Sequence, residues 1–175
     1  MKIAVFCSAN HDISPDYFAM TEDFGRWMGE NGHTLVYGGQ DRGLMKAIGD
    51  AVHAAGGTLV GVIPQILVKR GQRPDILDVE IPCDNLSDRK DIMLAQADVC
   101  VALPGGVGTI DEVFSVAASH NIGYHKKMAV LYNMNGFWDG MVAMLDDMQA
   151  KGFVRGHWTD WIRVASNLEE LKDIL

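Results

Sequence analysis

Short runs of apolar residues recur along this chain, and a longer segment with the spacing of an amphipathic helix follows almost every run. A strand that is apolar at nearly every position has to be buried on both faces, which is typical of a parallel sheet covered by helices. Strands are predicted over Lys2–Phe6, Thr34–Tyr37, Leu59–Ile63, Val79–Pro82, Val99–Leu103, Lys127–Leu131 and Ile162–Ala165. Helices are predicted over residues 14–32, 44–55, 85–97, 110–121 and 137–152, and from Ser166 onward. The sequence therefore predicts an α/β fold with a mostly parallel central sheet between two helical layers.

The predicted helices carry recognisable start signals. Ser14 precedes Pro15, which is the arrangement of an N-cap followed by proline at the first helical position. Ser166 and Glu169 have the spacing of a capping box and are expected to open the last helix.

The 175 residues are predicted to form one domain that spans residues 1–175, because no linker, repeat or low-complexity tract divides them. No apolar run approaches the roughly 20 residues that cross a bilayer. The apolar start, Met1–Phe6, is too short for a signal peptide. We therefore expect a cytoplasmic protein with no membrane partner.

Charge and cysteine content narrow the range of partners. The net charge of −8 argues against binding nucleic acid, whose phosphates require a basic surface. The three cysteines are widely spaced and form no Cys-x-x-Cys pair, so no metal site is expected. Cys7 and Cys100 lie in strand-like runs and are predicted as small core residues of a protein in a reducing compartment. Any anion site has to be local, built from a few cations and backbone amides.

The stretch from Leu103 to Glu112 reads Leu-Pro-Gly-Gly-Val-Gly-Thr-Ile-Asp-Glu and joins a predicted strand to a predicted helix. Glycines in such a turn let backbone N–H groups approach an anion, and the new helix adds the positive end of its dipole. The hydroxyl of Thr109 adds a further polar group. These features predict a phosphate-binding turn formed by Gly105, Gly106, Val107, Gly108 and Thr109.

Plainer interpretations of this stretch remain open. Thr109 and Glu112 have the spacing of a capping box, so both side chains can serve the helix start alone. The glycines can also form nothing more than a tight turn. The stretch is not a dinucleotide fingerprint, because Asp111 stands where the third glycine belongs, and the chain has no P-loop triplet Gly-Lys-Ser/Thr.

Ligands of parallel sheets bind beyond the carboxyl ends of the strands, near a change in strand order. The loops after the first, second and fifth strands, with the start of the helix at Asn85, are therefore expected to meet. These segments carry Ser8, Asn10, Gly38, Gly39, Arg89, Lys90 and the glycine turn. From the residues alone, Arg89 also fits a solvated helix position paired with Asp88 or Asp91. The segment 64–78, which carries Lys69, Arg70 and Arg73, is predicted as a long loop with one helical turn.

Three stretches together carry a family resemblance. They are Tyr37-Gly38-Gly39 with Gly43-Leu44-Met45, then Arg89-Lys90, then Pro104-Gly105-Gly106-Val107-Gly108-Thr109-Ile110-Asp111-Glu112. In these motifs the chain resembles the Lonely Guy (LOG) family of cytokinin-activating nucleotide phosphoribohydrolases, long mislabelled as lysine decarboxylases. The resemblance implies a Rossmann-like three-layer sandwich that forms at least a dimer. It also implies hydrolysis of the N-glycosidic bond of a nucleoside 5′-monophosphate to free base and ribose 5-phosphate, without a metal or an organic cofactor.

The resemblance also assigns roles to residues. Arg89 and Glu112 occupy the catalytic positions, and the Gly105–Thr109 turn with Lys90 holds the 5′-phosphate. A carboxylate beside the ribose can stabilise the positive charge that develops as the bond breaks and can orient the attacking water. Asp111 is adjacent to Glu112 on the predicted helix and does not share its face, so Asp111 is expected to complement the helix dipole or to orient the backbone.

The chain departs from the family pattern at four places. Gln40 replaces the third glycine after Tyr37, Leu86-Ser87 replaces a Met-His pair, and an acidic residue of the long loop has no counterpart near Lys69-Arg70-Gly71. Residues 118–123 read Ala-Ser-His-Asn-Ile-Gly where the family has Thr-Trp-x-Gln-Leu-Gly. These departures leave open which base is cleaved. They also motivate an alternative, a non-catalytic carrier of a nucleotide or a phosphorylated cofactor. A PLP-dependent decarboxylase would need a buried Schiff-base lysine with a pyridinium partner, and the sequence identifies neither.

Overall fold

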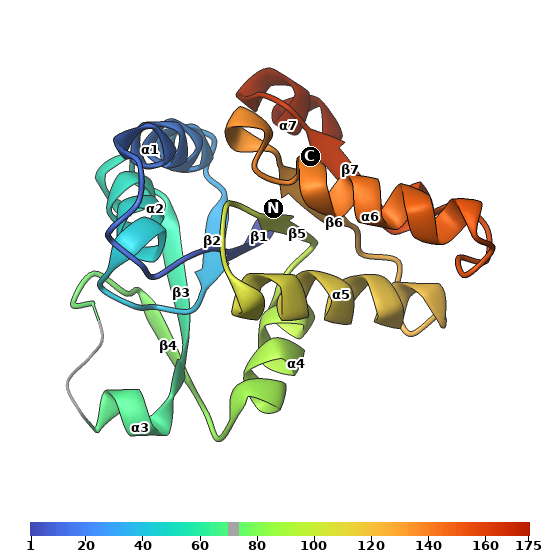
Figure 1. The fold of residues 1–175 in the computed structure, drawn as a ribbon. Coiled ribbons are helices and arrows are strands. Elements are labelled where there is room, and N and C mark those ends of the chain that lie inside the picture. The colour runs from blue at the N-terminus through green and yellow to red at the C-terminus, as the bar shows by residue number, and fades with distance from the viewer. Residues whose placement is uncertain (70–73) are drawn as a thin grey trace.

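The computed structural model describes residues 1–69 and 74–175 and confirms the predicted α/β class (Figure 1). Its sheet has seven strands, and every neighbouring pair is parallel. The strands are β1 (Lys2–Phe6), β2 (Thr34–Tyr37), β3 (Thr58–Pro64), β4 (Val79–Cys83), β5 (Val99–Ala102), β6 (Ala129–Tyr132) and β7 (Ile162–Ala165). Three predicted strands, Lys2–Phe6, Thr34–Tyr37 and Ile162–Ala165, have these bounds, and the other four differ from them by one or two residues at an end.

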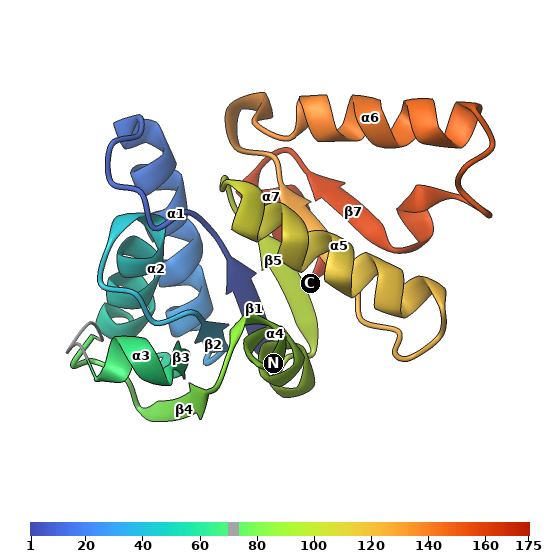
Figure 2. The same cartoon turned by 60° about the horizontal axis from the view of Figure 1, so that its bottom comes forward.

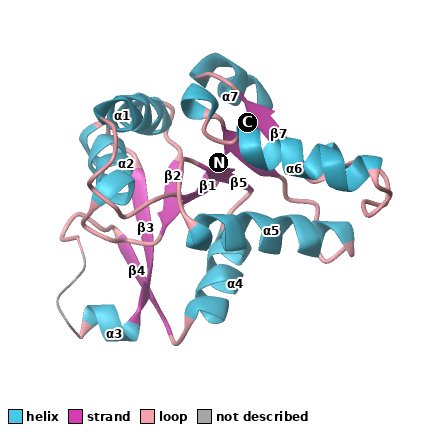
Figure 3. Ribbon diagram, viewed as in Figure 1, coloured by secondary structure: helices cyan, strands magenta, loops and turns pink. Residues whose placement is uncertain are grey.

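Helices cover both faces of the sheet, which completes the three layers (Figures 2 and 3). They are α1 (Pro15–Glu30), α2 (Gly43–Ala54), α3 (Gln65–Val68), α4 (Leu86–Gln96), α5 (Val107–Asn121), α6 (Asp139–Ala150) and α7 (Leu168–Ile174), with 3₁₀ turns at Met134–Gly136 and Trp158–Asp160. One apolar core joins the sheet to α1, α2 and α7, and the other joins it to α4, α5 and α6. Alternate residues of β1 enter the two cores, since Ile3 and Val5 face one and Ala4 and Phe6 face the other.

The strand order is β4-β3-β2-β1-β5-β6-β7, so the chain builds outward from β1 and then returns to add β5 on its other side. The change of direction between β1 and β5 is the switch point at which open α/β sheets bind ligands. Phe6 pairs with Ala102 at the carboxyl ends of these two strands. The loop that leaves β1 and the glycine turn that leaves β5 therefore begin side by side.

The structure corrects two predicted helix caps. The helix of the glycine turn begins at Val107 with Gly106 as N-cap, so Thr109 is the third helical residue and the Thr109–Glu112 capping box is wrong. At the last helix the N-cap is Asn167, so the predicted Ser166–Glu169 capping box is wrong. The Asn167 side chain accepts the Glu170 N–H at 2.9 Å, and the Glu170 carboxylate accepts the N–H of Ser166, the residue before the cap, at 2.7 Å.

Other local predictions have mixed outcomes. Ser14 and Pro15 do open α1, but the Ser14 hydroxyl makes no capping bond. The helical turn expected within residues 64–78 is α3. Arg70 and Arg73 lie outside the described residues.

Cys7, Cys83 and Cys100 are buried free thiols, which confirms the two predicted core cysteines. Within residues 1–69 and 74–175, no helix combines the length and apolar character needed to span a bilayer.

Candidate active site

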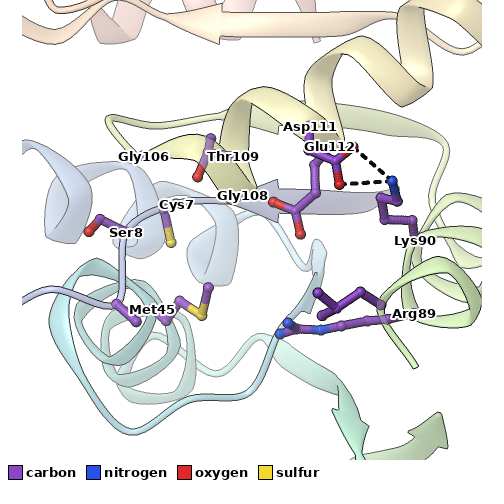
Figure 4. Close-up of a pocket in the computed structure, with 12 residues that line it drawn as sticks. Cys7, Ser8, Met45, Arg89, Lys90, Gly106, Gly108, Thr109, Asp111 and Glu112 are labelled. Carbon is purple, nitrogen blue, oxygen red and sulfur yellow. Dashed lines mark hydrogen bonds and ion pairs between the residues drawn. The ribbon is translucent and has the colours of Figure 1, made fainter. Parts of the chain in front are cut away.

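A cavity of about 230 Å³ opens at the switch point between β1 and β5 (Figure 4). The end of β1, the start of α2, the start of α4 and the first turn of α5 surround it. Its walls are formed by Cys7, Ser8, Ala9, Met45, Leu86, Arg89, Lys90, Gly106, Gly108, Thr109, Asp111 and Glu112. The loops after β1 and β5 and the start of α4 thus meet as predicted, whereas the loop after β2, which was expected to join them, contributes no residue to the walls.

The first turn of α5 supplies backbone donors to this cavity. Gly106 is the N-cap, and no side chain caps the helix. The first N–H group that donates a helical hydrogen bond is that of Ile110, which donates to the Gly106 carbonyl oxygen at 3.1 Å. The preceding N–H groups of the turn therefore remain available, as at any uncapped helix start. A Cβ built on Gly106 or Gly108 meets no described atom within 4 Å, so these glycines border open space. The arrangement suits an anion bound to a helix N-terminus.

Two neighbouring residues hold the turn in place. A Cβ on Gly105 would overlap the Thr109 side chain, so the glycine lets that side chain fold back under the turn. Thr109 is buried, and its hydroxyl points into the cavity in Figure 4. Ser8 links the loop after β1 to the turn, because its N–H donates to the Pro104 carbonyl at 3.1 Å. The Ser8 hydroxyl accepts the Asn10 N–H at 3.0 Å and keeps its own proton for a ligand.

Arg89 is buried, with 7% of its surface exposed. Its Nε donates to the Val62 carbonyl at 3.1 Å, while one terminal guanidinium nitrogen, Nη2, has no partner among the described residues. A Cβ on Gly38 would overlap this nitrogen, so the glycine after β2 makes room for the guanidinium. The alternative of a solvated Arg89 paired with Asp88 or Asp91 is wrong, because the side chain turns inward. A buried cation with an unused donor is a strong candidate for binding a ligand.

Glu112 lies between the glycine turn and Arg89, with its carboxyl group turned into the cavity (Figure 4). Burial raises its pKa from 4.5 to about 7; Arg89 and Lys90 oppose that rise and Asp111 adds to it. Among the described residues its carboxylate makes no hydrogen bond or salt bridge. An unpaired carboxyl group that titrates near neutral pH in a cavity is typical of an acid–base or charge-stabilising residue.

Lys90 and Asp111 form a salt bridge across the cavity edge, from α4 to α5. The Lys90 ammonium lies 2.8 Å and 2.9 Å from the two Asp111 oxygens and donates to the Ser115 hydroxyl at 3.0 Å. The Lys90 charge is thus held by Asp111 rather than left free for a phosphate. The bridge joins the two helices that carry Arg89 and Glu112.

The structure brings together most, but not all, of the predicted site residues. Ser8, Arg89, Lys90, Gly106, Gly108, Thr109, Asp111 and Glu112 line the cavity, whereas Gly38, Gly39, Gly105 and Val107 do not. Val107 is 84% exposed at the start of α5. Gly38 and Gly105 affect the cavity indirectly, because they leave room for the side chains of Arg89 and Thr109. Four lining residues were not predicted as site residues, namely Cys7, Ala9, Met45 and Leu86. Their positions next to the end of β1 and at the starts of two helices are the signal that could have identified them.

Fold and cavity together define a class, the Rossmann-like α/β proteins with a ligand site at the switch point of a parallel sheet. The comparison with known families is more specific. The model of a family described as "possible lysine decarboxylase" matches residues 45–175. The chain belongs to this family, which is the Lonely Guy family that its sequence motifs resemble.

Two relatives by sequence carry the same enzyme name. The chain is 34% identical to the cytokinin riboside 5′-monophosphate phosphoribohydrolase of Mycobacterium tuberculosis over 96% of its own length and 89% of that protein. It is 33% identical to LOG2 of Arabidopsis thaliana, which has the same enzyme name, over 99% of its own length and 82% of the relative.

By structure, the chain is similar to the molybdenum cofactor binding protein of the phototrophic bacterium Rippkaea orientalis. The TM-score is 0.74 and the match covers 99% of this chain and 93% of the other, at 19% sequence identity. At that identity the likeness establishes the shared fold and no more.

Proposed function

We propose that this protein hydrolyses the N-glycosidic bond of a nucleoside 5′-monophosphate and releases the free base and ribose 5-phosphate. The observation that carries the proposal is Glu112, an unpaired carboxyl group with a pKa of about 7 in one cavity with a buried guanidinium and an uncapped helix start. The enzyme name shared by relatives that are about one-third identical supports it.

The first turn of α5 binds the 5′-phosphate in this proposal. The backbone N–H groups of residues 107–109 at the uncapped helix start donate to the anion together with the Thr109 hydroxyl, and the helix dipole favours its charge. The ribose then extends from the turn toward Glu112, since a phosphate ester and its sugar are joined by one carbon atom. The unused donors of Arg89 face the sugar hydroxyls from the opposite wall.

The reaction breaks the C1′–N bond, and the bonding electron pair leaves with the base. Positive charge develops on C1′ and the ring oxygen, where the ionised Glu112 carboxylate stabilises it. A water molecule forms the new C1′–O bond, Glu112 takes its proton, and that proton neutralises the departing base. A carboxyl group with a pKa near 7 can accept and return a proton at neutral pH more readily than one near 4.5.

A carrier that binds a nucleotide or a phosphorylated cofactor without cleaving it is the second candidate. The four departures from the family pattern and the fold shared with the Rippkaea orientalis protein support it. Glu112 favours hydrolysis, because a binding protein gains nothing from a buried carboxyl group poised to titrate near neutrality.

We also propose that the chain forms at least a homodimer, as the family resemblance implies. Leu86 and Val107, large apolar side chains that are 67% and 84% exposed at the starts of α4 and α5, support a covered surface there. Sedimentation velocity across a concentration series tests this, and a monomer at every concentration would contradict it.

The enzymatic proposal is tested by chromatography of free base after incubation with a panel of nucleoside monophosphates that includes AMP and N6-isopentenyl-AMP. Glu112→Gln, which keeps the volume and removes the charge, is the matched variant and is expected to lower base release about 100-fold or more. Wild-type protein that binds nucleotides in a thermal shift assay but releases no base would support the carrier instead. Release that is equal in both forms would remove Glu112 from the mechanism.

A further inference from the structure

A second cavity, of about 290 Å³, lies between α4 and α5 and shares Lys90 and Glu112 with the first. Glu112 therefore borders both spaces. The glycine turn lies on one side of it, and the second cavity extends away from the turn, further along α4 and α5. We call this second cavity the α4–α5 groove.

The groove combines an apolar floor with a polar rim. The floor is formed by Phe6, Leu94 and Val116, and the rim carries Ser87, Asp91, Ser115 and Ser119. Ser87, Asp91 and Leu94 fall on one face of α4, and Glu112, Ser115 and Ser119 on one face of α5. Helix faces that pack against each other are usually apolar, so hydroxyls and a carboxylate on both faces are unusual for a structural contact.

Several of these polar groups are not used within the protein. Ser115 accepts a hydrogen bond from Lys90 at 3.0 Å. The side chains of Ser87, Asp91 and Ser119 make no hydrogen bond or salt bridge within the described part of the chain. The groove thus offers hydroxyl donors and a carboxylate acceptor next to apolar surface, the usual composition of a small-molecule pocket.

Two departures from the family pattern line this groove, one on each helix. Ser87 stands where the pattern has histidine and Ser119 where it has tryptophan, although 32 positions separate them in the sequence. Both changes replace a ring with a small hydroxyl side chain. The groove therefore owes part of its size and its polar rim to residues particular to this chain.

We propose that the α4–α5 groove is the subsite for the nucleobase, and that its polar rim selects an unmodified base with an exposed amino group, such as adenine, over one with an apolar N6 substituent. This inference rests on the proposed function, since it extends the nucleotide from the glycine turn past Glu112. With the phosphate at the turn and the ribose beside Glu112, the base enters the next space along the same line.

The size and chemistry of the groove fit this occupant. An apolar cavity of about 150 Å³ is known to bind benzene, so about 290 Å³ accommodates a two-ring base. The faces of the base lie against Phe6, Leu94 and Val116, and its amino group donates to Asp91. A prenyl chain on the amino nitrogen would cover Asp91 and the serine hydroxyls without replacing their hydrogen bonds to water, which is unfavourable.

Binding measurements in a Glu112→Gln background test the subsite without depending on turnover. Ser119→Leu fills the groove from α5, and Ala95→Leu adds the same apolar bulk to an exposed position of α4 outside both cavities. Calorimetry then compares three ligands in both variants: AMP, N6-isopentenyl-AMP and ribose 5-phosphate, which has no base.

We expect Ser119→Leu to weaken AMP binding about tenfold or more, equivalent to about 1.4 kcal/mol, and to leave ribose 5-phosphate unchanged, whereas Ala95→Leu changes neither. We also expect AMP to bind more tightly than N6-isopentenyl-AMP before the groove is filled, and Asp91→Leu to reduce that preference. AMP binding that survives Ser119→Leu, or a preference for the isopentenyl nucleotide, would overturn the inference. Failure of the proposed function has a different signature, namely intact AMP binding with no base released by wild-type protein.

Discussion

The two helix pairs on opposite faces of the sheet are built by opposite rules. α1 and α2 are close-packed, because Gly25 and Gly29 let the helix backbones approach Ala51 and Ala55. α4 and α5 touch at few positions, are bridged by Lys90 and Asp111, and leave cavities on either side of Glu112. The close contact of the first pair follows its glycines, and the cavity of about 450 Å³ beside that contact is lined by alanines and by exposed charged residues such as Glu22, Arg26 and Asp50. The second pair instead leaves space on either side of a mostly buried carboxyl group, and the candidate chemistry lies there.

The largest effect is expected from adding bulk to the close-packed pair. A Cβ on Gly29 lies 2.5 Å from the Ala55 Cβ and 2.8 Å from the Val52 carbonyl oxygen. Gly29→Leu should therefore destabilise the protein by about 3 kcal/mol and lower Tm by roughly 6 to 12 °C. Ser119→Leu, the same side chain placed in the open pair, should change Tm by less than about 2 °C. Thermal unfolding of both variants makes the comparison, and equal losses would show that the α4–α5 groove is a packed contact after all.

The next largest effect is a gain in the free energy of unfolding when the carboxylate of Glu112, which lies in the more open α4–α5 pair, is replaced by a neutral amide. Glu112 has a pKa of about 7 in the folded protein against an ordinary value of 4.5, so the folded state binds its proton more tightly than the unfolded state does. Ionisation therefore costs stability increasingly as pH rises from 4.5 to 7, and the full cost persists above pH 7. Glu112→Gln should raise stability by about 2 kcal/mol at pH 8 and change little at pH 4.

Denaturant unfolding at the two pH values measures this difference. Glu22→Gln on the exposed face of α1, where the side chain makes no hydrogen bond or salt bridge with the described residues, is the control and should be neutral at both pH values. A Glu112→Gln variant that is less stable than wild type at pH 8 would contradict the expected pKa and show that the carboxylate is well solvated or paired.

A smaller effect is expected from the glycine behind Arg89. Gly38→Ala puts a methyl group where the guanidinium lies, so Arg89 has to move within the cavity while the helices stay in place. Catalytic efficiency for the preferred nucleotide should fall about tenfold, or about 1.4 kcal/mol, by steady-state kinetics. Gly140→Ala, whose Cβ meets no described atom within 4 Å, should leave kcat/KM unchanged. If both variants behave alike, Arg89 is not positioned by Gly38.

The smallest expected effect is on the pH dependence of activity, and it distinguishes Lys90 from Asp111, the two partners of the salt bridge. Lys90 lowers the pKa of Glu112 and Asp111 raises it. The acid limb of kcat/KM should therefore move to higher pH in Lys90→Met and to lower pH in Asp111→Asn, and both shifts should be small because both side chains are partly solvated. A pH–rate profile of each variant gives the midpoint. Shifts in the same direction would mean that the bridge acts on activity through structure rather than through charge.

The architecture was predictable because it depends on local patterns. Continuous apolar runs such as Val99–Leu103 indicated buried parallel strands, and the glycines that follow indicated an anion site. The helix starts were less accurate because capping depends on one residue, and Gly106 and Asn167 took positions assigned to Thr109 and Ser166. Backbone geometry decides such choices, and sequence spacing alone does not.

Other properties of the site depend on distances between elements that no local pattern encodes. The burial of Arg89 requires the space above Gly38, which lies on a different strand end. The Lys90–Asp111 bridge and the α4–α5 groove depend on how far apart two helices lie, and the sequence does not state that separation.

The central position of β1 also has a consequence for how the protein is made. β1 leaves the ribosome before the other six strands, pairs with β2, and keeps its other edge open until β5 has emerged. At typical translation rates that interval is on the order of several seconds. An unpaired apolar strand edge invites association with other chains, so the emerging chain is most exposed to aggregation before the glycine turn appears. Ribosome-bound chains in which β5 is still inside the exit tunnel should accordingly engage chaperones more strongly than chains in which β5 and α5 have emerged from it.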